Sequence, residues 1–282
     1  MDNGVRYDWI TFLSDYGLDD LFVGVCKGVL AQRAPHATVI DLCHQISRQD
    51  VRHGASVLAA SVDYLPVGVH LALVDPMDSA PKPGVVIRTE TGSMLVGPDN
   101  GLLWLAAEAL GPVAAHAICN DELWLPRHSR TFRGRDVFSP VAAHLAAGGD
   151  LAAVGPRLDP ADLVRLTFRR PAIDDDHVHG EVQSVDHFGN LSLNVERADL
   201  EAAGMTLGDN VELRCSGRAM SVPFALTYGE VPPGRLALCE DSFRAVMIAV
   251  NLGSAADALR ARPGDPVVVA RVAQTSEAAR LG

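Results

Sequence analysis

The sequence predicts an α/β domain with a mostly parallel central sheet, followed by a smaller all-β barrel or sandwich domain. Up to residue 156, short apolar runs alternate with stretches of helical periodicity, which is typical of parallel strands joined by helices. From residue 179 onward the segments are short, β-rich and separated by glycine and proline turns. We therefore expect domains over residues 1–156 and 179–282, joined by a connector over residues 157–178.

Each predicted element follows from a local pattern. A short, nearly continuous apolar run predicts a buried strand at residues 9–13, and two further strands are predicted at residues 38–42 and 69–74. A Glu90-Thr91-Gly92 turn between two extended segments predicts a hairpin over residues 85–88 and 93–96. Apolar positions at helical spacing predict helices over residues 22–30, 51–62 (capped by Asp50), 102–110 and 140–147. In the second domain we expect strands at residues 181–185, 191–195, 210–214, 218–222, 245–250 and 266–272.

Composition excludes several classes of protein. The 282 residues include 24 Lys and Arg against 35 Asp and Glu, a net charge of −11, without any basic run that nucleic acid would need. No apolar stretch approaches the roughly 18 residues of a membrane span, and the N-terminus lacks the pattern of a signal peptide. The five scattered cysteines predict reduced thiols in a cytoplasmic protein, and their spacing does not suggest a metal site.

Carboxylates mark the candidate functional edge. Asp15 and Asp75 each follow a predicted parallel strand, and ligands of such sheets bind beyond the carboxyl ends of the strands. The sequence has no GxGxxG and no Walker motif, so a nucleotide held by its phosphates is not supported. A ligand held through ribose hydroxyls and base edges needs carboxylates and amides, which Asp15 and the segment Asp186 to Asn190 supply.

Two further motifs have both a functional and a structural interpretation. The turn Gly97 to Gly101 either presents backbone N–H groups to a polar ligand or is an ordinary tight turn with a cap. The run Thr131 to Asp136 either brings an aromatic ring, two arginines and a carboxylate to a functional site, or has a structural role in which Arg135 pairs with Asp136 or with another carboxylate. Nucleophilic triads and paired-histidine metal spacings are missing from the sequence, so the single histidines are expected to be satisfied core or surface residues.

Taken in order, these motifs resemble one family. They are SDYG at 14–17, VDP at 74–76, GPDNG at 97–101, TFRGRDVFSP at 131–140, DHFGN at 186–190 and IAVNLGSA at 248–255. Together they resemble the S-adenosylmethionine hydroxide adenosyltransferases, adenosine-forming hydrolases related to fluorinase and chlorinase, from about residue 9 to residue 272. The resemblance implies S-adenosylmethionine as substrate, no separate cofactor, and a homotrimer whose sites lie between the first domain of one subunit and the second domain of its neighbour.

The resemblance also implies roles for individual residues. Asp15 matches the carboxylate that holds the ribose hydroxyls, and Asn190 matches the residue that reads the adenine edge, with Phe188 beside it. Asp186 and Ser242 match positions that grip the methionine end. The remaining positions that we expect to bind substrate are Asp20, Asn100 and Leu252.

The water-activating set departs from the family pattern. Asp75 matches the first member of an Asp-Arg-His set, where the halogenases carry a tyrosine. Lys82 stands at the expected arginine and Arg133 at the expected histidine. Lysine replaces arginine only as a point charge, and an arginine stays protonated and cannot act as a general base. The expected catalytic residues are therefore Asp75, Lys82 and Arg133.

Three functions remain open on the sequence. The leading hypothesis is a hydrolase that converts S-adenosylmethionine and water to adenosine and L-methionine. The second is a non-catalytic protein that binds S-adenosylmethionine or adenosine, which the missing histidine motivates. The third is a halogenase in which Arg133 and Lys82 bind an anionic nucleophile, and Asp75 argues against it because a carboxylate repels a halide.

Overall fold

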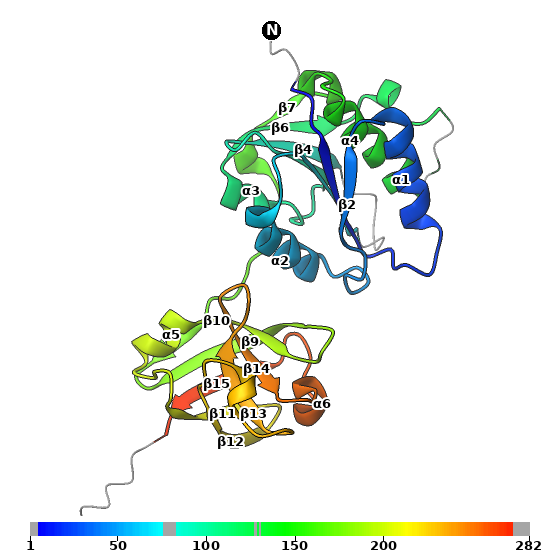
Figure 1. The fold of residues 1–282 in the computed structure, drawn as a ribbon. Coiled ribbons are helices and arrows are strands. Elements are labelled where there is room, and N and C mark those ends of the chain that lie inside the picture. The colour runs from blue at the N-terminus through cyan, green and yellow to red at the C-terminus, as the bar shows by residue number, and fades with distance from the viewer. Residues whose placement is uncertain (1–4, 76–82, 127–128, 130, 273–282) are drawn as a thin grey trace, which may run out of the picture. The chain divides into compact units, whose positions relative to one another are not determined.

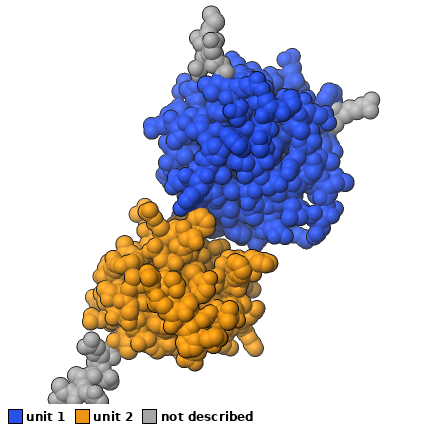
Figure 2. All heavy atoms as spheres, viewed as in Figure 1, with its two compact units in different colours: residues 1–167 blue, residues 168–282 orange. Residues whose placement is uncertain are grey.

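The computed structural model describes residues 5–75, 83–126, 129 and 131–272. The chain separates into two compact units, residues 1–167 and residues 168–282 (Figure 2). Each unit has its own hydrophobic core.

The first unit contains a seven-stranded mixed sheet of order β2-β1-β3-β5-β4-β6-β7. The pairs β2–β1, β1–β3 and β3–β5 are parallel, and the pairs from β5 to β7 are antiparallel. The strands are β1 (Trp9–Ser14), β2 (Thr38–Cys43), β3 (Val69–Leu73), β4 (Gly84–Thr89), β5 (Met94–Pro98), β6 (Pro112–Ile118) and β7 (Arg157–Leu158). The α/β class, the three parallel strands and the β4–β5 hairpin are confirmed. The sequence did not predict β6 or β7.

Helices cover both faces of this sheet (Figure 1). Phe12 and Leu71 point to the face covered by α1 and α4, whereas Leu13 and Ala72 point to the face covered by α2 and α3. Successive residues of one strand thus enter opposite cores, which is why the strand sequences are continuously apolar. The helices are α1 (Phe22–Arg33), α2 (Val51–Ser61), α3 (Trp104–Leu110) and α4 (Ser139–Ala146). The predicted cap is confirmed, because the Asp50 side chain accepts from the His53 N–H at 2.9 Å.

The second unit is a nearly closed antiparallel barrel of order β12-β11-β15-β9-β10-β14-β13, with β8 paired to β9. Its two edges approach each other where Phe224 bridges Leu238 and the Ala225 N–H donates to the Leu238 carbonyl at 2.9 Å. The elements are β8 (Ala172–Asp174), β9 (His177–Val185), β10 (Leu191–Glu196), α5 (Arg197–Ala202), β11 (Asn210–Cys215), β12 (Arg218–Pro223), β13 (Leu236–Glu240), β14 (Ala245–Val250), α6 (Ala255–Leu259) and β15 (Pro266–Arg271). All six strands predicted for this region are present, and β8 and β13 are additional.

All five cysteines are free thiols. In the parts of the chain that the structure describes, no helix is long and apolar enough to cross a membrane.

His70 gives the first unit a pH-dependent stability. The imidazole is buried in β3, its Nδ1 lies 2.9 Å from the Thr11 hydroxyl, and burial lowers its pKa to about 4. The unfolded chain protonates this group near pH 6.5, so the free energy of unfolding falls as the pH drops from about 6.5 to about 4, by about 3 kcal/mol in total.

We expect His70→Asn, which keeps an acceptor for Thr11, to remove this part of the pH dependence. Urea unfolding at about pH 7 and about pH 4.5 measures it for the wild type, for His70→Asn and for His187→Asn on an exposed loop. If the free energy of unfolding fell equally between the two pH values in the wild type and in His70→Asn, the assignment of this pH dependence to His70 would be wrong.

Candidate active site

Two carboxylates follow adjacent parallel strands at the carboxyl edge of the sheet. Ser14 at the end of β1 pairs with Leu73 at the end of β3, and the Asp15 N–H donates to the Leu73 carbonyl at 3.4 Å. Asp15 and Asp75 therefore follow adjacent strands of one parallel pair. This register places both residues at the same edge of the sheet, which is the edge where we expected a ligand to bind.

The Asp15 carboxylate is fixed from a neighbouring loop. Its Oδ2 accepts the Gln49 N–H at 2.8 Å, and Gln49 has a left-handed backbone with φ of 62°. Such a conformation costs a non-glycine residue free energy, so the loop before α2 is held in this shape by its surroundings. Burial raises the pKa of the Asp15 carboxyl, and the bond from Gln49 opposes the rise. Because Gln49 acts through its backbone, its side-chain type gave no sequence signal.

A chain of polar contacts from the exposed Asp41 through the buried His44 to Ser14 supports the Asp15 loop. The Ser14 hydroxyl lies 2.8 Å from His44 Nδ1, and His44 Nε2 lies 3.3 Å from Asp41. The carbonyl of His44 also accepts the Gly17 N–H at 2.8 Å. Ser14 and His44 are both buried, so this chain holds the loop and does not present a nucleophile. His44 is the satisfied core histidine that the sequence predicted.

Asp75 faces a cation from the segment Thr131 to Pro140 of the first unit. Arg133 Nη1 lies 3.9 Å from Asp75 Oδ2, and both side chains are mostly buried. The Arg133 guanidinium lies 4.9 Å from the centre of the Phe138 ring. Phe138 is the last residue of the π-helical turn Gly134–Phe138, and Arg133 directly precedes that turn. Burial lowers the pKa of Arg133, and Asp75 opposes this shift. Arg133 remains a cation beside Asp75 and cannot accept a proton there.

Tyr16 is a neighbour of this pair that the sequence analysis did not single out. Its ring makes edge contacts with Phe12 and Phe132, and its hydroxyl lies so close to Gly134 that a side chain there would collide with it. Burial raises the pKa of the Tyr16 phenol; Asp15 and Asp75 add to the rise, and Arg133 opposes it. The available signal was its place between Asp15 and Gly17 in the SDYG motif.

Arg135 belongs to the scaffold. Its Nε and Nη2 donate to the two oxygens of Asp136 at 2.6 and 2.9 Å, and Asp136 also accepts the Ser129 N–H at 2.7 Å. Asp136 is fully buried, so this bidentate pair satisfies its charge. The structural interpretation of the Arg135–Asp136 pair is confirmed.

Three other expected residues of the first unit have different surroundings. Asn100 is buried; its Nδ2 donates to the Val74 carbonyl at 2.8 Å and its Oδ1 accepts the Leu102 N–H at 3.1 Å. Both amide atoms of Asn100 are thus used inside the protein, and the turn has its expected cap. Asp20 is exposed just before α1. Lys82 lies outside the described residues.

In the second unit, Asp186 organises the loop that carries its neighbours. Its Oδ1 accepts the N–H groups of Phe188 and Asn190, both at 2.9 Å, and its Oδ2 accepts the Asn190 side-chain amide at 2.8 Å. The loop is therefore rigidly closed on one carboxylate. It leaves the Phe188 ring 75% exposed.

Two more loops are tied to the same region. The Ala256 N–H donates to the Gly189 carbonyl at 2.9 Å, which holds the loop bearing Leu252 against the Asp186 loop. The Ser192 hydroxyl, two residues beyond Asn190, donates to Asp241 at 3.0 Å and so ties down the turn that carries Ser242. The structure thus groups the expected residues of the second unit on loops fastened to β10 and its preceding turn.

Among the described residues, no cluster of three or more His, Cys, Asp or Glu side chains is arranged to hold a metal ion.

Comparison with known proteins identifies the family. The model of the N-terminal domain of S-adenosylmethionine hydroxide adenosyltransferase matches residues 10–155, and the model of its C-terminal domain matches residues 180–268. The chain belongs to the S-adenosylmethionine hydroxide adenosyltransferase family.

Individual relatives agree with this assignment. The chain is 46% identical to an (R)-S-adenosyl-L-methionine hydrolase of Salinispora arenicola, over 93% of this chain and 97% of that protein. It is 28% identical to a fluorinase of Nocardia brasiliensis, over 78% of this chain and 82% of that protein. A crystal structure of an uncharacterized conserved protein from Thermotoga maritima superposes with a TM-score of 0.85 at 36% identity, covering 93% of this chain and all of that one.

Proposed function

We propose that this chain hydrolyses (R)-S-adenosyl-L-methionine at the ribose C5′ and releases adenosine and L-methionine. The observation that carries the proposal is the Asp75 carboxylate, which stands beside Arg133 at 3.9 Å and next along the sheet edge to Asp15. A carboxylate at this position suits activation of water and disfavours a halide nucleophile.

The proposed step is a single in-line displacement. The water oxygen forms a bond to C5′ while the C5′–S bond breaks. The electron pair of the broken bond stays on sulfur, which neutralises the sulfonium and gives methionine. The proton lost by the water passes to Asp75 and then to solvent. The leaving group is neutral, so the reaction needs no cofactor, and the protein contributes mainly the orientation of water and substrate.

Arg133 has an electrostatic role in this proposal. A cation at 3.9 Å favours the ionised form of Asp75 and restricts its orientation, but it also weakens the carboxylate as a base. Because Arg133 cannot take the proton itself, Asp75 is the acceptor in the described part of the site. We therefore expect slow turnover.

The substrate contacts follow the same proposal. Asp15 holds the ribose hydroxyls, the exposed Phe188 ring stacks on the adenine, and Asn190 reads the adenine edge. Asp186 and Ser242 face the methionine end, with Asp20 and Leu252 as further contacts. Lys82, which lies outside the described residues, is the remaining cation of the proposed catalytic set.

We also propose a homotrimer with active sites at its subunit interfaces. The support is the exposed apolar surface on the loops of the second unit. Phe188, Phe243 and Leu252 are 75%, 58% and 86% exposed. Grouped apolar side chains of this size favour a covering partner, and a second copy of the chain supplies one.

Replacing Asp75 tests the proposed reaction directly. We expect the wild type to release adenosine and methionine in equal amounts, and Asp75→Asn to lower kcat by about 10²–10⁴-fold, because the general base is lost. Binding of S-adenosylmethionine by Asp75→Asn is expected to persist. Chromatography of the reaction and calorimetry of binding measure the two quantities.

Other outcomes distinguish the alternative functions. Binding without adenosine release, unchanged by Arg133→His, would establish a non-catalytic binding protein. Formation of a 5′-halo-adenosine at high halide concentration would establish a halogenase.

The raised pKa of Asp15 predicts a pH dependence of substrate capture. The ribose hydroxyls are held by the carboxylate form, so kcat/KM falls as the pH drops through a pKa that lies above the ordinary value. Asp15→Asn should abolish this acidic limb and raise KM by about 10- to 100-fold through the lost charge-assisted bond. Rates measured across the acidic range for the wild type, Asp15→Asn and the exposed neighbour Asp19→Asn test this; an unchanged limb in Asp15→Asn would refute it.

The trimer is tested by measuring mass in solution. Light scattering of the purified protein should give three times the 30.0 kDa chain mass. Replacing Phe188 and Leu252 by serine should lower the assembled fraction, whereas Tyr64→Ser, at an exposed ring of the first unit, should not. A monomeric wild type would overturn the assembly.

A further inference from the structure

We propose that Asn100 is a positioning residue for Asp75, and that the segment 163–167, here called the strap, locks Asn100 in place. This inference rests on the proposed function, because it concerns the carboxylate that activates water. It assigns to Asn100 a role other than contact with substrate.

Asn100 fixes the peptide group that leads into Asp75. Its Nδ2 donates to the Val74 carbonyl at 2.8 Å, while the preceding carbonyl, that of Leu73, accepts the Asp15 N–H at 3.4 Å. Strand β3 ends at Leu73, so the Val74 carbonyl lies beyond the sheet and depends on Asn100 for its orientation. Rotation of this peptide group would swing the Asp75 side chain away from Arg133.

The turn that carries Asn100 is packed directly onto β3. A Cβ on Gly97 would collide with the Ala72 carbonyl, and Gly101 has φ of +93°, a conformation that favours glycine. The Asn100 Oδ1 accepts the Leu102 N–H at 3.1 Å, so the second amide atom closes the turn on itself. With both atoms engaged, the buried Asn100 side chain has one stable orientation.

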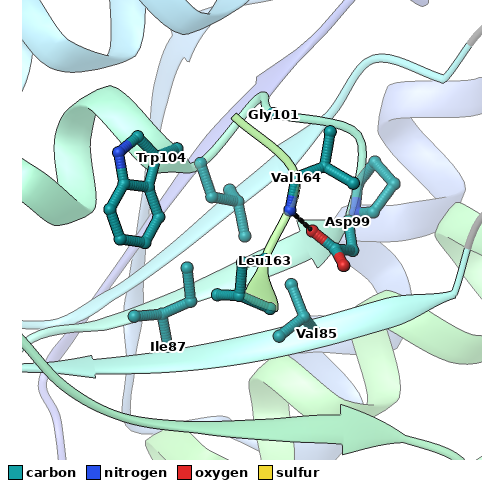
Figure 3. Close-up of a pocket in the computed structure, with 9 residues that line it drawn as sticks. Val85, Ile87, Asp99, Gly101, Trp104, Leu163 and Val164 are labelled. Carbon is teal, nitrogen blue, oxygen red and sulfur yellow. Dashed lines mark hydrogen bonds between the residues drawn. The ribbon is translucent and has the colours of Figure 1, made fainter. Parts of the chain in front are cut away.

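The strap covers this turn from outside (Figure 3). Asp99 Oδ1 accepts the Val164 N–H at 2.9 Å, and the Leu163 side chain is buried over Val85 and Ile87. A Cβ on Gly101 would collide with the Leu166 side chain, so this glycine leaves the space that the strap needs.

Two arginine contacts hold the middle and the end of the strap. The Arg165 guanidinium lies 4.1 Å from the centre of the Trp104 ring, and Arg52 donates to the Thr167 carbonyl at 2.7 Å. The strap is therefore fixed on α2, α3 and the turn together. Thr167 is the last residue of both the strap and the first unit. The turn Gly97 to Gly101 therefore anchors both the chain that leads to the second unit and the peptide before Asp75.

A serine substitution separates the two bonds of Asn100. In Asn100→Ser the short hydroxyl still accepts from the Leu102 N–H, as serine does in caps and turns, but it no longer reaches the Val74 carbonyl. We expect kcat to fall by about 10- to 100-fold, because Asp75 is misplaced, with KM within about threefold of the wild type.

The chain offers a matched control in Asn120. Its Nδ2 donates to the Ala153 carbonyl at 2.8 Å and its Oδ1 accepts the Glu122 N–H at 3.1 Å, the same pair of bonds between different elements. Asn120→Ser should lose a similar amount of stability and keep kcat. Arg165→Ala removes the contact with Trp104 and should lower kcat by about two- to fivefold without changing KM.

A readout independent of turnover completes the test. The titration of Asp75, followed by carboxylate carbon-13 resonance and assigned by its absence in Asp75→Asn, should shift in Asn100→Ser and stay unchanged in Asn120→Ser. An unshifted titration, or a kcat for Asn100→Ser equal to that of Asn120→Ser, overturns the inference while leaving the hydrolase assignment intact. Failure of the hydrolase assignment is recognised separately, because the wild type itself would then release no adenosine.

Discussion

The parallel pairing of β1 with β3 is the constraint on which the first unit's site depends. The register that pairs Ser14 with Leu73 places Asp15 and Asp75 after adjacent strands at one edge of the sheet, and a slip of one residue in either strand would turn its side chains to the other face. The continuously apolar strands fix this register from both sides, because Phe12 and Leu13 belong to different cores. The site's geometry is thus a consequence of core packing.

Backbone groups do much of the remaining positioning. Asp15 is held by the N–H of Gln49, and Asp75 follows a carbonyl that is held by Asn100. In the second unit, Asp186 collects two backbone N–H groups and one amide. These bonds hold Asp15 and Asp186 in one orientation, and such preorganisation lowers the entropy that binding must overcome.

The sequence predicted those features of the fold and the site that depend on residue type and on hydrophobic periodicity. Asp15 and Asp75 were found because a carboxylate directly follows an apolar run, and the Arg135–Asp136 pair was foreseeable from adjacency. Strand β6 was missed because its alanine-rich sequence has little strand propensity and is held by pairing with β4. Gln49 and the true partners of Asn100 were inaccessible, since a backbone donor has no sequence signature and a partner 26 residues away requires the fold.

Arg133 is a cation that is built into the fold beside Asp75. Its guanidinium is stacked on Phe138 and faces Asp75, so the position is fully integrated into the fold. A permanent cation stabilises the charge of Asp75 but provides no alternative proton acceptor. In the proposed reaction the proton from water passes to Asp75, which makes the exact placement of that carboxylate more important than in a site with a titratable partner. The bonds that hold the Leu73 and Val74 carbonyls meet this requirement.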